Sequence, residues 1–83
     1  MSHSHQHYIR ELLRDFKELG VRVVVFLDGF HVEGRVRHVG NEFVVLTTNV
    51  EVESNSSGVP IENPNRIWIK ISKIRAVSDD HGA

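Results

Sequence analysis

The chain has 83 residues, no cysteine, and ten basic against eleven acidic residues, which give a formal net charge of -1. The absence of cysteine excludes disulfides and thiolate zinc sites, and the balanced charge excludes a global field that would attract nucleic acid or an anionic membrane. No apolar run reaches the length of a membrane-spanning helix. We therefore expect one soluble, cytoplasmic domain, of a size at which a single core is only marginally sufficient.

The first seven residues are polar and carry histidines at alternate positions, His3, His5 and His7. Alternate histidines can present several imidazoles to one metal ion, but this segment has no carboxylate or cysteine to complete a site. We therefore expect residues 1–7 to be a disordered tail without a metal site, and residues 79–83 to be a polar tail.

Residues 8–19 are expected to form an amphipathic helix, because apolar side chains recur with helical spacing at Ile9, Leu12, Leu13, Phe16 and Leu19. Gly20 follows the last of them, and a left-handed glycine there would end the helix. Charged residues of both signs fill the opposite side, which argues against a membrane-surface role. The apolar stripe is therefore expected to pack over the open end of the protein's own sheet.

Five strand-like segments follow the helix, at about residues 21–27, 30–38, 43–53, 66–71 and 74–77. The first three are joined by turns too short for anything but antiparallel neighbours, at Asp28-Gly29 and at Gly40-Asn41. Gly34 lies inside the second strand, where a glycine is unfavourable unless the strand bends sharply or another backbone approaches. Residues 54–65 are rich in Ser, Asn, Gly and Pro and are expected to form a surface loop.

The pattern therefore predicts a mostly β fold in a single domain at residues 8–78, with an N-terminal helix before a five-stranded, strongly bent antiparallel small barrel. This order resembles the Sm-like (LSm) fold, an SH3-like barrel. The match is closest to the bacterial Sm-like RNA chaperone Hfq, between Val25 and Leu46. That family has a turn residue and a glycine after the first strand, as at Asp28-Gly29, and a second glycine five residues on, as at Gly34. The resemblance implies a homo-oligomeric ring that binds single-stranded RNA in RNA metabolism or regulation.

Site residues follow from the same resemblance. Asn41 corresponds to the amide that reads a base edge in the family, while Glu42 stands where an aromatic residue is usual. Lys70 occupies the basic position of the Ile-Arg-Gly motif of archaeal and eukaryotic Sm-like proteins, with Ile71 in place of its glycine. We expect Asn41 and Lys70 to contact RNA, and a further basic group to add phosphate contacts: Arg35, Arg37 and His38.

Each of these residues also has a purely structural interpretation. Strand arginines can simply be solvated, Asn41 can form a turn, and Lys70 can protect an edge strand from aggregation. The near-zero net charge and the acidic residues Glu33, Glu42, Glu51 and Glu53 favour an alternative function, an Sm-like protein-interaction module without direct RNA binding. No side-chain pair supplies a nucleophile and its base, so we expect no enzyme activity and no cofactor.

Self-association is expected from the fourth and fifth strands. Trp68 falls on the outer face of a short strand and needs a cover. If the fourth strand of one subunit pairs with the fifth strand of the next, near Ile74 and Ala76, a ring of about five to seven subunits would close. The alternative is a monomer in which the helix or the 54–65 loop covers Trp68.

Overall fold

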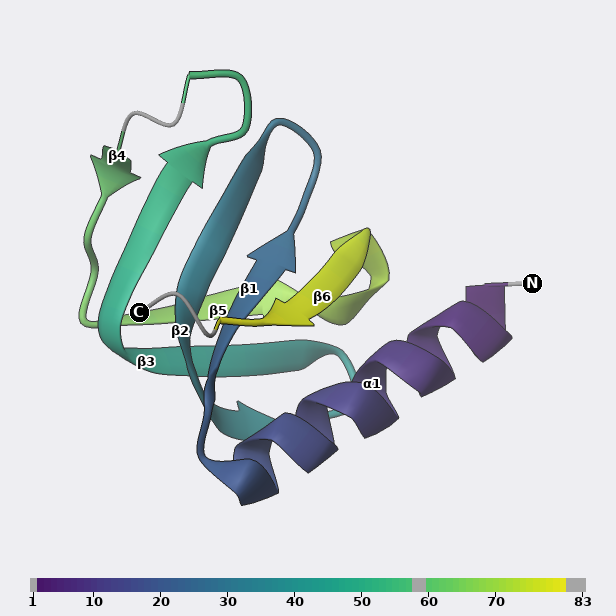
Figure 1. The fold of residues 1–83 in the computed structure, drawn as a ribbon. Coiled ribbons are helices and arrows are strands. Elements are labelled where there is room, and N and C mark those ends of the chain that lie inside the picture. Colours follow the sequence, from purple (N-terminus) through teal and green to yellow (C-terminus); the bar gives the residue numbers. More distant parts are fainter. Residues whose placement is uncertain (1, 58–59, 81–83) are drawn as a thin grey trace.

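The computed structural model describes residues 2–57 and 60–80. One helix packs beneath a strongly bent antiparallel sheet (Figure 1). The elements in chain order are α1 (Ser2–Leu19), β1 (Arg22–Phe26), β2 (Phe30–Val39), β3 (Phe43–Ser54), β4 (Pro60–Glu62), β5 (Arg66–Lys70), a 3-10 turn η1 (Ile71–Lys73) and β6 (Ala76–Asp79). The expected helix and five-stranded bent barrel are confirmed. The short β4 is an additional strand, within the segment that we expected to be loop throughout.

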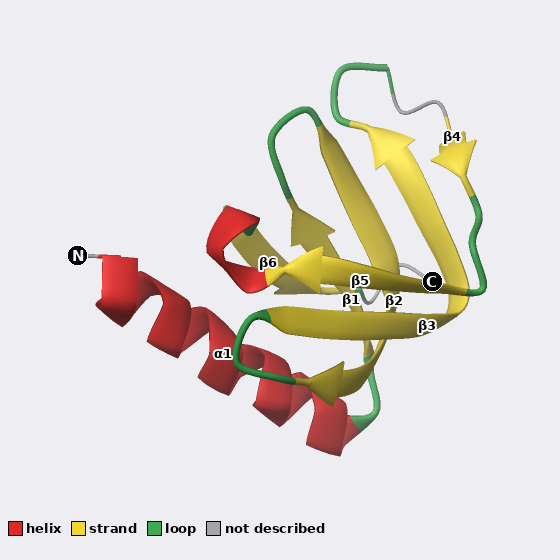
Figure 2. Ribbon diagram, turned by 180° about the vertical axis from the view of Figure 1, so that it is seen from behind, coloured by secondary structure: helices red, strands yellow, loops and turns green. Residues whose placement is uncertain are grey.

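The sheet folds around β3, whose two halves pair with different strands (Figure 2). Its first half, from Phe43 to Thr47, pairs with β5, and its second half pairs with β4 near Val52. The order across the rest of the sheet is β4-β3-β2-β1-β6. Within residues 2–57 and 60–80, β5 pairs only with β3 and β6 only with β1. Both strands therefore keep one free edge.

The bend is centred on Gly34 of β2. Between Glu33 and Arg35 the partner on β3 moves from Glu51 to Thr47, so β3 bulges at this point. A Cβ atom on Gly34 would lie only 3.1 Å from the carbonyl oxygen of Thr47. The expectation that Gly34 admits a second backbone is therefore confirmed.

The bulge itself contains two consecutive residues with left-handed backbone, Thr48 with φ 68° and Asn49 with φ 53°. Asparagine adopts this conformation more readily than most residues, whereas it is unfavourable for a β-branched residue such as threonine. No turn signal in the sequence marks this pair, because both residues lie inside a run with strand-like alternation.

The core lies between α1 and the concave face of the sheet. Its fully buried side chains are Leu13, Val23, Val25, Val32, Val44, Leu46, Val50, Ile71 and Ile74. From α1, Ile9 and Leu13 are buried and Phe16 packs against them, whereas Leu12 and Leu19 are 36% and 70% exposed. The helix contacts β2, η1 and β6. The apolar stripe therefore packs on the protein's own sheet, as expected, although only part of it is used.

Both ends of α1 are defined by contacts. At the C-terminal end Gly20 has φ 69° and its N–H donates to the carbonyl of Phe16, which confirms the expected glycine cap. At the other end α1 begins at Ser2, so the expected disordered tail is wrong for residues 2–7. His5 donates from Nε2 to the carbonyl of Ile74 at 3.0 Å. This contact, distant in sequence, stabilises the first turns, which carry no acidic residue to signal a helix start.

The C-terminal strand is displaced from its expected position. β6 spans Ala76–Asp79 rather than 74–77, because the 3-10 turn η1 precedes it and Ile74 packs into the core with 1% of its surface exposed. Asp79 is therefore part of the sheet and not of a polar tail. Residues 81–83 of that expected tail lie outside the described residues.

Candidate nucleic-acid interface

A shallow cavity of about 220 Å³ brings together two of the predicted RNA-binding residues. It is lined by Gln6, Asn41, Glu42, Lys70 and Ser72. Asn41 and Lys70 are 29 positions apart in the sequence and both are exposed. The cavity therefore offers two amide side chains, one ammonium group, one hydroxyl and one carboxylate to a ligand.

Strand pairing explains why these residues meet. Phe43, the first residue of β3, pairs with Lys70, the last residue of β5. The ladder continues one step further, since the N–H of Ile71 donates to the carbonyl of Glu42 at 2.8 Å. The turn at residues 40–42 is therefore held beside the end of β5, and Asn41 and Lys70 share one edge of the barrel.

The helix adds a residue that sequence reasoning missed. Gln6 falls in the segment that we expected to be disordered, but α1 extends through it and carries Gln6 to the wall of the cavity. Arg10, one turn further along, reaches the backbone carbonyl of Asn41 at 3.5 Å. The helical stripe itself was the available signal, because His5 and Ile9 continue its i, i+4 spacing towards the N-terminus.

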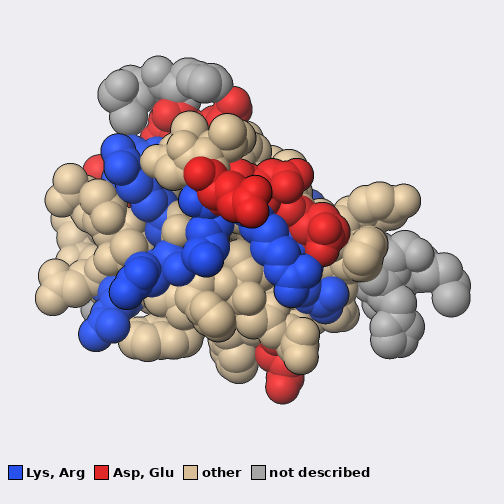
Figure 3. All heavy atoms as spheres, turned by 90° about the horizontal axis from the view of Figure 1, so that it is seen from below, with Lys and Arg blue, Asp and Glu red and all other residues tan. Residues whose placement is uncertain are grey.

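The predicted phosphate-binding residues are not gathered in this cavity. His38 lines a separate hollow of about 260 Å³ with Arg14, Lys17, Glu18 and Val39. Arg14 and Lys17 were not predicted as site residues. On the face of the molecule seen from below, basic and acidic side chains lie next to one another (Figure 3). Arg35 and Arg37 are exposed on β2 and line neither hollow.

The predicted interface residues divide into surface and core. Trp68 on β5 is 59% exposed, and the guanidinium of Arg66 lies 5.6 Å from the centroid of its ring. Neither α1 nor the described part of the 54–65 segment buries this side chain. Ala76 is exposed on β6, beside the free edge. Ile74, in contrast, is a core residue, so its expected position at a subunit interface is wrong.

A further cluster of polar side chains, formed by His31, Glu33 and Glu53, lies at the opposite end of β2 from the turn at residues 40–42. The pKa of His31 is raised, chiefly by a hydrogen bond to Asn55 and also by Glu53, against the opposing effect of burial. The pKa of Glu33 is raised by burial, then by a hydrogen bond to Asp80 and by neighbouring carboxylates. The sequence patterns did not predict that His31, Glu33 and Glu53 lie close together.

The chain shows no match to any model of a protein family, and none to the curated proteins. Solved structures do match. A Pyrococcus abyssii Sm protein in complex with a uridine heptamer aligns with a TM-score of 0.67 and 21% identity, over 84% of this chain and 94% of that one. An SmAP (LSm) protein from Methanococcus vannielii aligns with a TM-score of 0.59 and 22% identity, over 82% and 89% of the two chains.

A heptameric archaeal Sm protein aligns with a TM-score of 0.63 and 19% identity, over 84% of this chain and 97% of that one.

Among residues 2–57 and 60–80, no helix has the length and apolarity to cross a membrane. The closer similarity to Hfq stays a prediction. The helix, the bent β2 and the shared β3 agree with these alignments, and the chain has the Sm-like fold.

Proposed function

We propose that this protein is a cytoplasmic, homo-oligomeric Sm-like ring that binds single-stranded RNA and has no catalytic activity. The observation that carries the proposal is the cavity in which Asn41 and Lys70 meet, at the end of β5 and beside the turn between β2 and β3. The alignment with an Sm protein in complex with a uridine heptamer supports it.

The chemistry of the cavity suits a base more than a phosphate. The amides of Gln6 and Asn41 each offer a donor and an acceptor to the edge of an unstacked base. Lys70 supplies one positive charge, but Glu42 lies in the same cavity and repels phosphate. RNA would therefore place bases in the cavity and phosphates towards basic side chains outside it, such as Arg14, Lys17 and His38.

Ring assembly is supported by the two free edges. In the part of the chain that the structure describes, β5 pairs only with β3 and β6 only with β1, so one edge of each strand is open to a partner strand. Pairing β5 of one subunit with β6 of the next joins different surfaces, and a constant rotation then closes a ring. One of the aligned structures is a heptameric archaeal Sm protein. Trp68, exposed on β5, would lie near such a contact.

The test combines molar mass in solution with RNA titration. Light scattering at tens of micromolar should give a mass of several subunits, and fluorescence anisotropy should detect binding of short homopolymeric RNAs. Because the net charge is -1, we expect weak binding that is lost steeply as salt rises. A monomer mass would contradict the ring, and binding that does not respond to salt would contradict the RNA contacts.

A second candidate function is a protein-interaction module on the same fold. Glu42 in the cavity and exposed apolar side chains at Tyr8, Phe43 and Trp68 favour it. Such surfaces are typical of protein partners rather than of RNA. An oligomer of the expected mass that binds none of the RNAs at low salt would favour this function.

A further inference from the structure

Four ionisable side chains form a square on the outer face of β2 and β3. Strand pairing sets His31 directly opposite Glu53, and Glu33 directly opposite Glu51. Residues two apart on a strand share a face, so all four point to the same side of the sheet. Two carboxylates directly opposite each other repel, and this arrangement is unfavourable without a nearby cation. None of the four is fully exposed.

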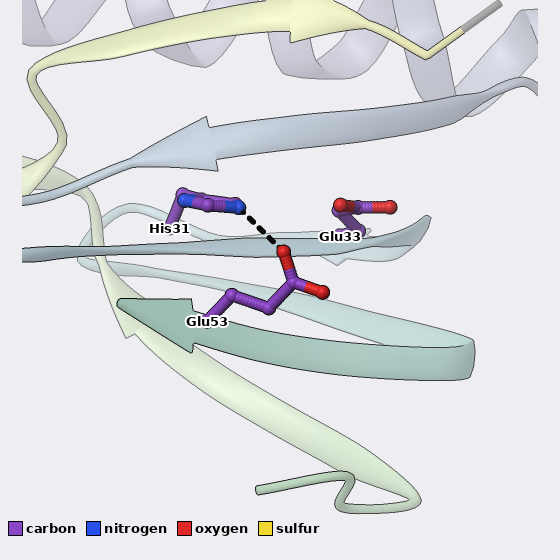
Figure 4. Close-up of side chains that lie close together, drawn as sticks. All are labelled: His31, Glu33 and Glu53. Atoms are coloured by element: carbon purple, nitrogen blue, oxygen red, sulfur yellow. Dashed lines mark hydrogen bonds and ion pairs between the residues drawn. The ribbon is translucent and has the colours of Figure 1, made fainter. Parts of the chain in front are cut away.

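Hydrogen bonds at both nitrogens orient the imidazole of His31, and the one to Glu53 is drawn in Figure 4. Asn55 donates from its side-chain nitrogen to the carbonyl of Leu27 at 3.2 Å, so its side-chain oxygen faces Nδ1 of His31 at 2.7 Å. Nδ1 must therefore carry a proton and donate. The ring also packs against Phe26, with 5.6 Å between the centroids. The other nitrogen, Nε2, faces the carboxylate of Glu53 at 3.1 Å.

This is the arrangement in which histidines bind metals. A metal-ligating histidine usually donates its second N–H to an oxygen, which leaves the remaining nitrogen free to coordinate. Here Asn55 holds the N–H of Nδ1, and the lone pair of Nε2 would point towards two carboxylates when that nitrogen is unprotonated. The ligand atoms of His31, Glu33 and Glu53 all lie within 4.8 Å of one another.

We propose that His31, Glu33 and Glu53 form a binding site for a divalent transition-metal ion, with Asn55 positioning the histidine. One imidazole and two carboxylates suit Zn²⁺, which also takes three protein ligands and a water. Bonds of about 2.0–2.1 Å in a tetrahedron place neighbouring ligand atoms about 3.3 Å apart. The 3.1 Å between Nε2 of His31 and Oε1 of Glu53 is already close to this spacing.

The charge around the site also favours a cation. The guanidinium of Arg22 lies 3.9 Å from the carboxylate of Glu33 and 3.7 Å from that of Asp80, so two carboxylates share one positive charge. Glu51 and Glu53 add two more negative charges to this face. A divalent ion would relieve the repulsion among them. The site is independent of the RNA cavity, since His31 and the turn at residues 40–42 are at opposite ends of β2.

The proposal is tested by titrating the full chain with ZnCl₂ in a calorimeter. The histidines of α1 must first be removed as competing ligands, so the reference protein carries His3→Gln, His5→Gln and His7→Gln. We expect one equivalent of Zn²⁺ to bind to it. Glu33→Gln with Glu53→Gln should weaken binding at least about tenfold, and Asn55→Ala should weaken it by about ten- to a hundredfold, because the hydrogen bond that orients the imidazole is lost.

Glu51→Gln is the matched control, because it removes a carboxylate from the same face without removing one of the three ligands. Its affinity should stay within about threefold of the reference. Circular dichroism establishes that each variant is folded, and the ring signals of His31 in NMR report binding at the site itself. The proposal is overturned if the reference protein takes up no Zn²⁺ at millimolar concentration. It is equally overturned if the Glu33/Glu53 variant keeps the reference affinity.

Discussion

The guanidinium of Arg22 donates a hydrogen bond of 2.7 Å to the backbone carbonyl of Thr48, 26 positions away. A second bond, of 3.1 Å, runs to the carbonyl of Asn49. These two carbonyls belong to the left-handed residues of the β3 bulge, which cannot continue the strand ladder. The arginine of β1 therefore stabilises the conformation that turns β3 from one strand partner to another.

Replacing Arg22 by alanine should lower the free energy of unfolding by about 1–3 kcal/mol, because hydrogen bonds from a charged donor are lost at a largely buried side chain. Chemical denaturation measures this. Arg75→Ala is the control, since its ion pair with Asp28 is 3.6 Å long and both side chains are well exposed. That variant should change stability by less than about 1 kcal/mol. Equal effects of the two would mean that the Arg22 contacts do not stabilise the bulge.

Thr48→Asn should stabilise the protein by about 0.5–1 kcal/mol. Threonine at φ 68° is strained by its branched Cβ, whereas asparagine tolerates the left-handed region. The side chain of residue 48 is exposed, so the change removes no core contact. A rise in melting temperature is the expected result. Thr47→Asn, one residue earlier and within the regular ladder, should not raise it.

Gly34→Val should destabilise the domain by at least about 2 kcal/mol, because a branched side chain has no room there. Its Cβ would meet the carbonyl oxygen of Thr47 at 3.1 Å and the Cβ of Leu46 at 3.3 Å, which are backbone and core atoms. The melting temperature of the variant, compared with that of the parent protein, measures this loss of stability. Arg35→Val places the same residue on the exposed face next to it and should have little effect. An unchanged melting temperature for Gly34→Val would mean that the two strands are not in close contact.

The sequence predicted this fold well at positions where the local backbone geometry allows only one residue type. Gly20, Gly29 and Gly34 each occupy a position where a left-handed backbone or a close approach requires glycine. The predictions were wrong where contacts between residues far apart in the sequence determine the local structure. The first turns of α1 depend on His5 meeting the carbonyl of Ile74, and Ile74 itself is buried because η1 delays the last strand.

For the candidate sites, too, the sequence predicted residues that a local motif marks and missed those brought together by distant contacts. The family pattern singled out Asn41 and Lys70 as separate RNA-binding candidates, and the structure places both in one cavity. Gln6 could not be found while its segment was expected to be disordered. The square around His31 and Glu33 was present in the alternation of β2 and β3. Its register, which sets His31 opposite Glu53, is determined by the bulge and cannot be read from either strand alone.

The cavity predicts opposite effects for two substitutions on RNA affinity. Lys70→Ala should weaken binding of every RNA and make the affinity less sensitive to salt, because it removes the positive charge that this cavity presents to any RNA. Glu42→Tyr removes a negative charge and offers a stacking surface, so it should tighten binding by about tenfold or more. Anisotropy titrations measure both. Arg75→Ala serves as the control, because that arginine does not line the cavity.

If neither substitution changes RNA affinity, the cavity is not the binding site. If Glu42→Tyr weakens RNA binding while Lys70→Ala has no effect, Glu42 would contact the RNA as a hydrogen-bond acceptor, and the electrostatic roles expected for both residues would be wrong.

The ring depends on the free edge of β6, and Val77→Pro tests that edge selectively. The N–H of Asp80 donates to the carbonyl of Arg22 at 2.9 Å, towards β1. Successive N–H groups of a strand alternate in direction, so the N–H groups of Ser78 and Ala76, which pair with Val24 and Phe26, also point to β1, and that of Val77 points to the free edge. A proline at position 77 removes that one donor, and proline is tolerated in an edge strand where its nitrogen faces away from the paired strand.

We expect Val77→Pro to lower the mass measured by light scattering towards that of a monomer, while far-UV circular dichroism keeps the signature of a folded β domain. Ile74→Asp cannot serve this purpose, because it would place a charge in the core and unfold the subunit. The chain has a single Trp, Trp68 on the facing strand β5, which the next subunit should cover in the oligomer. Its fluorescence should therefore shift to longer wavelength in Val77→Pro, when the oligomer dissociates. A variant that keeps both the parent mass and the parent emission would show that subunits do not join through β6.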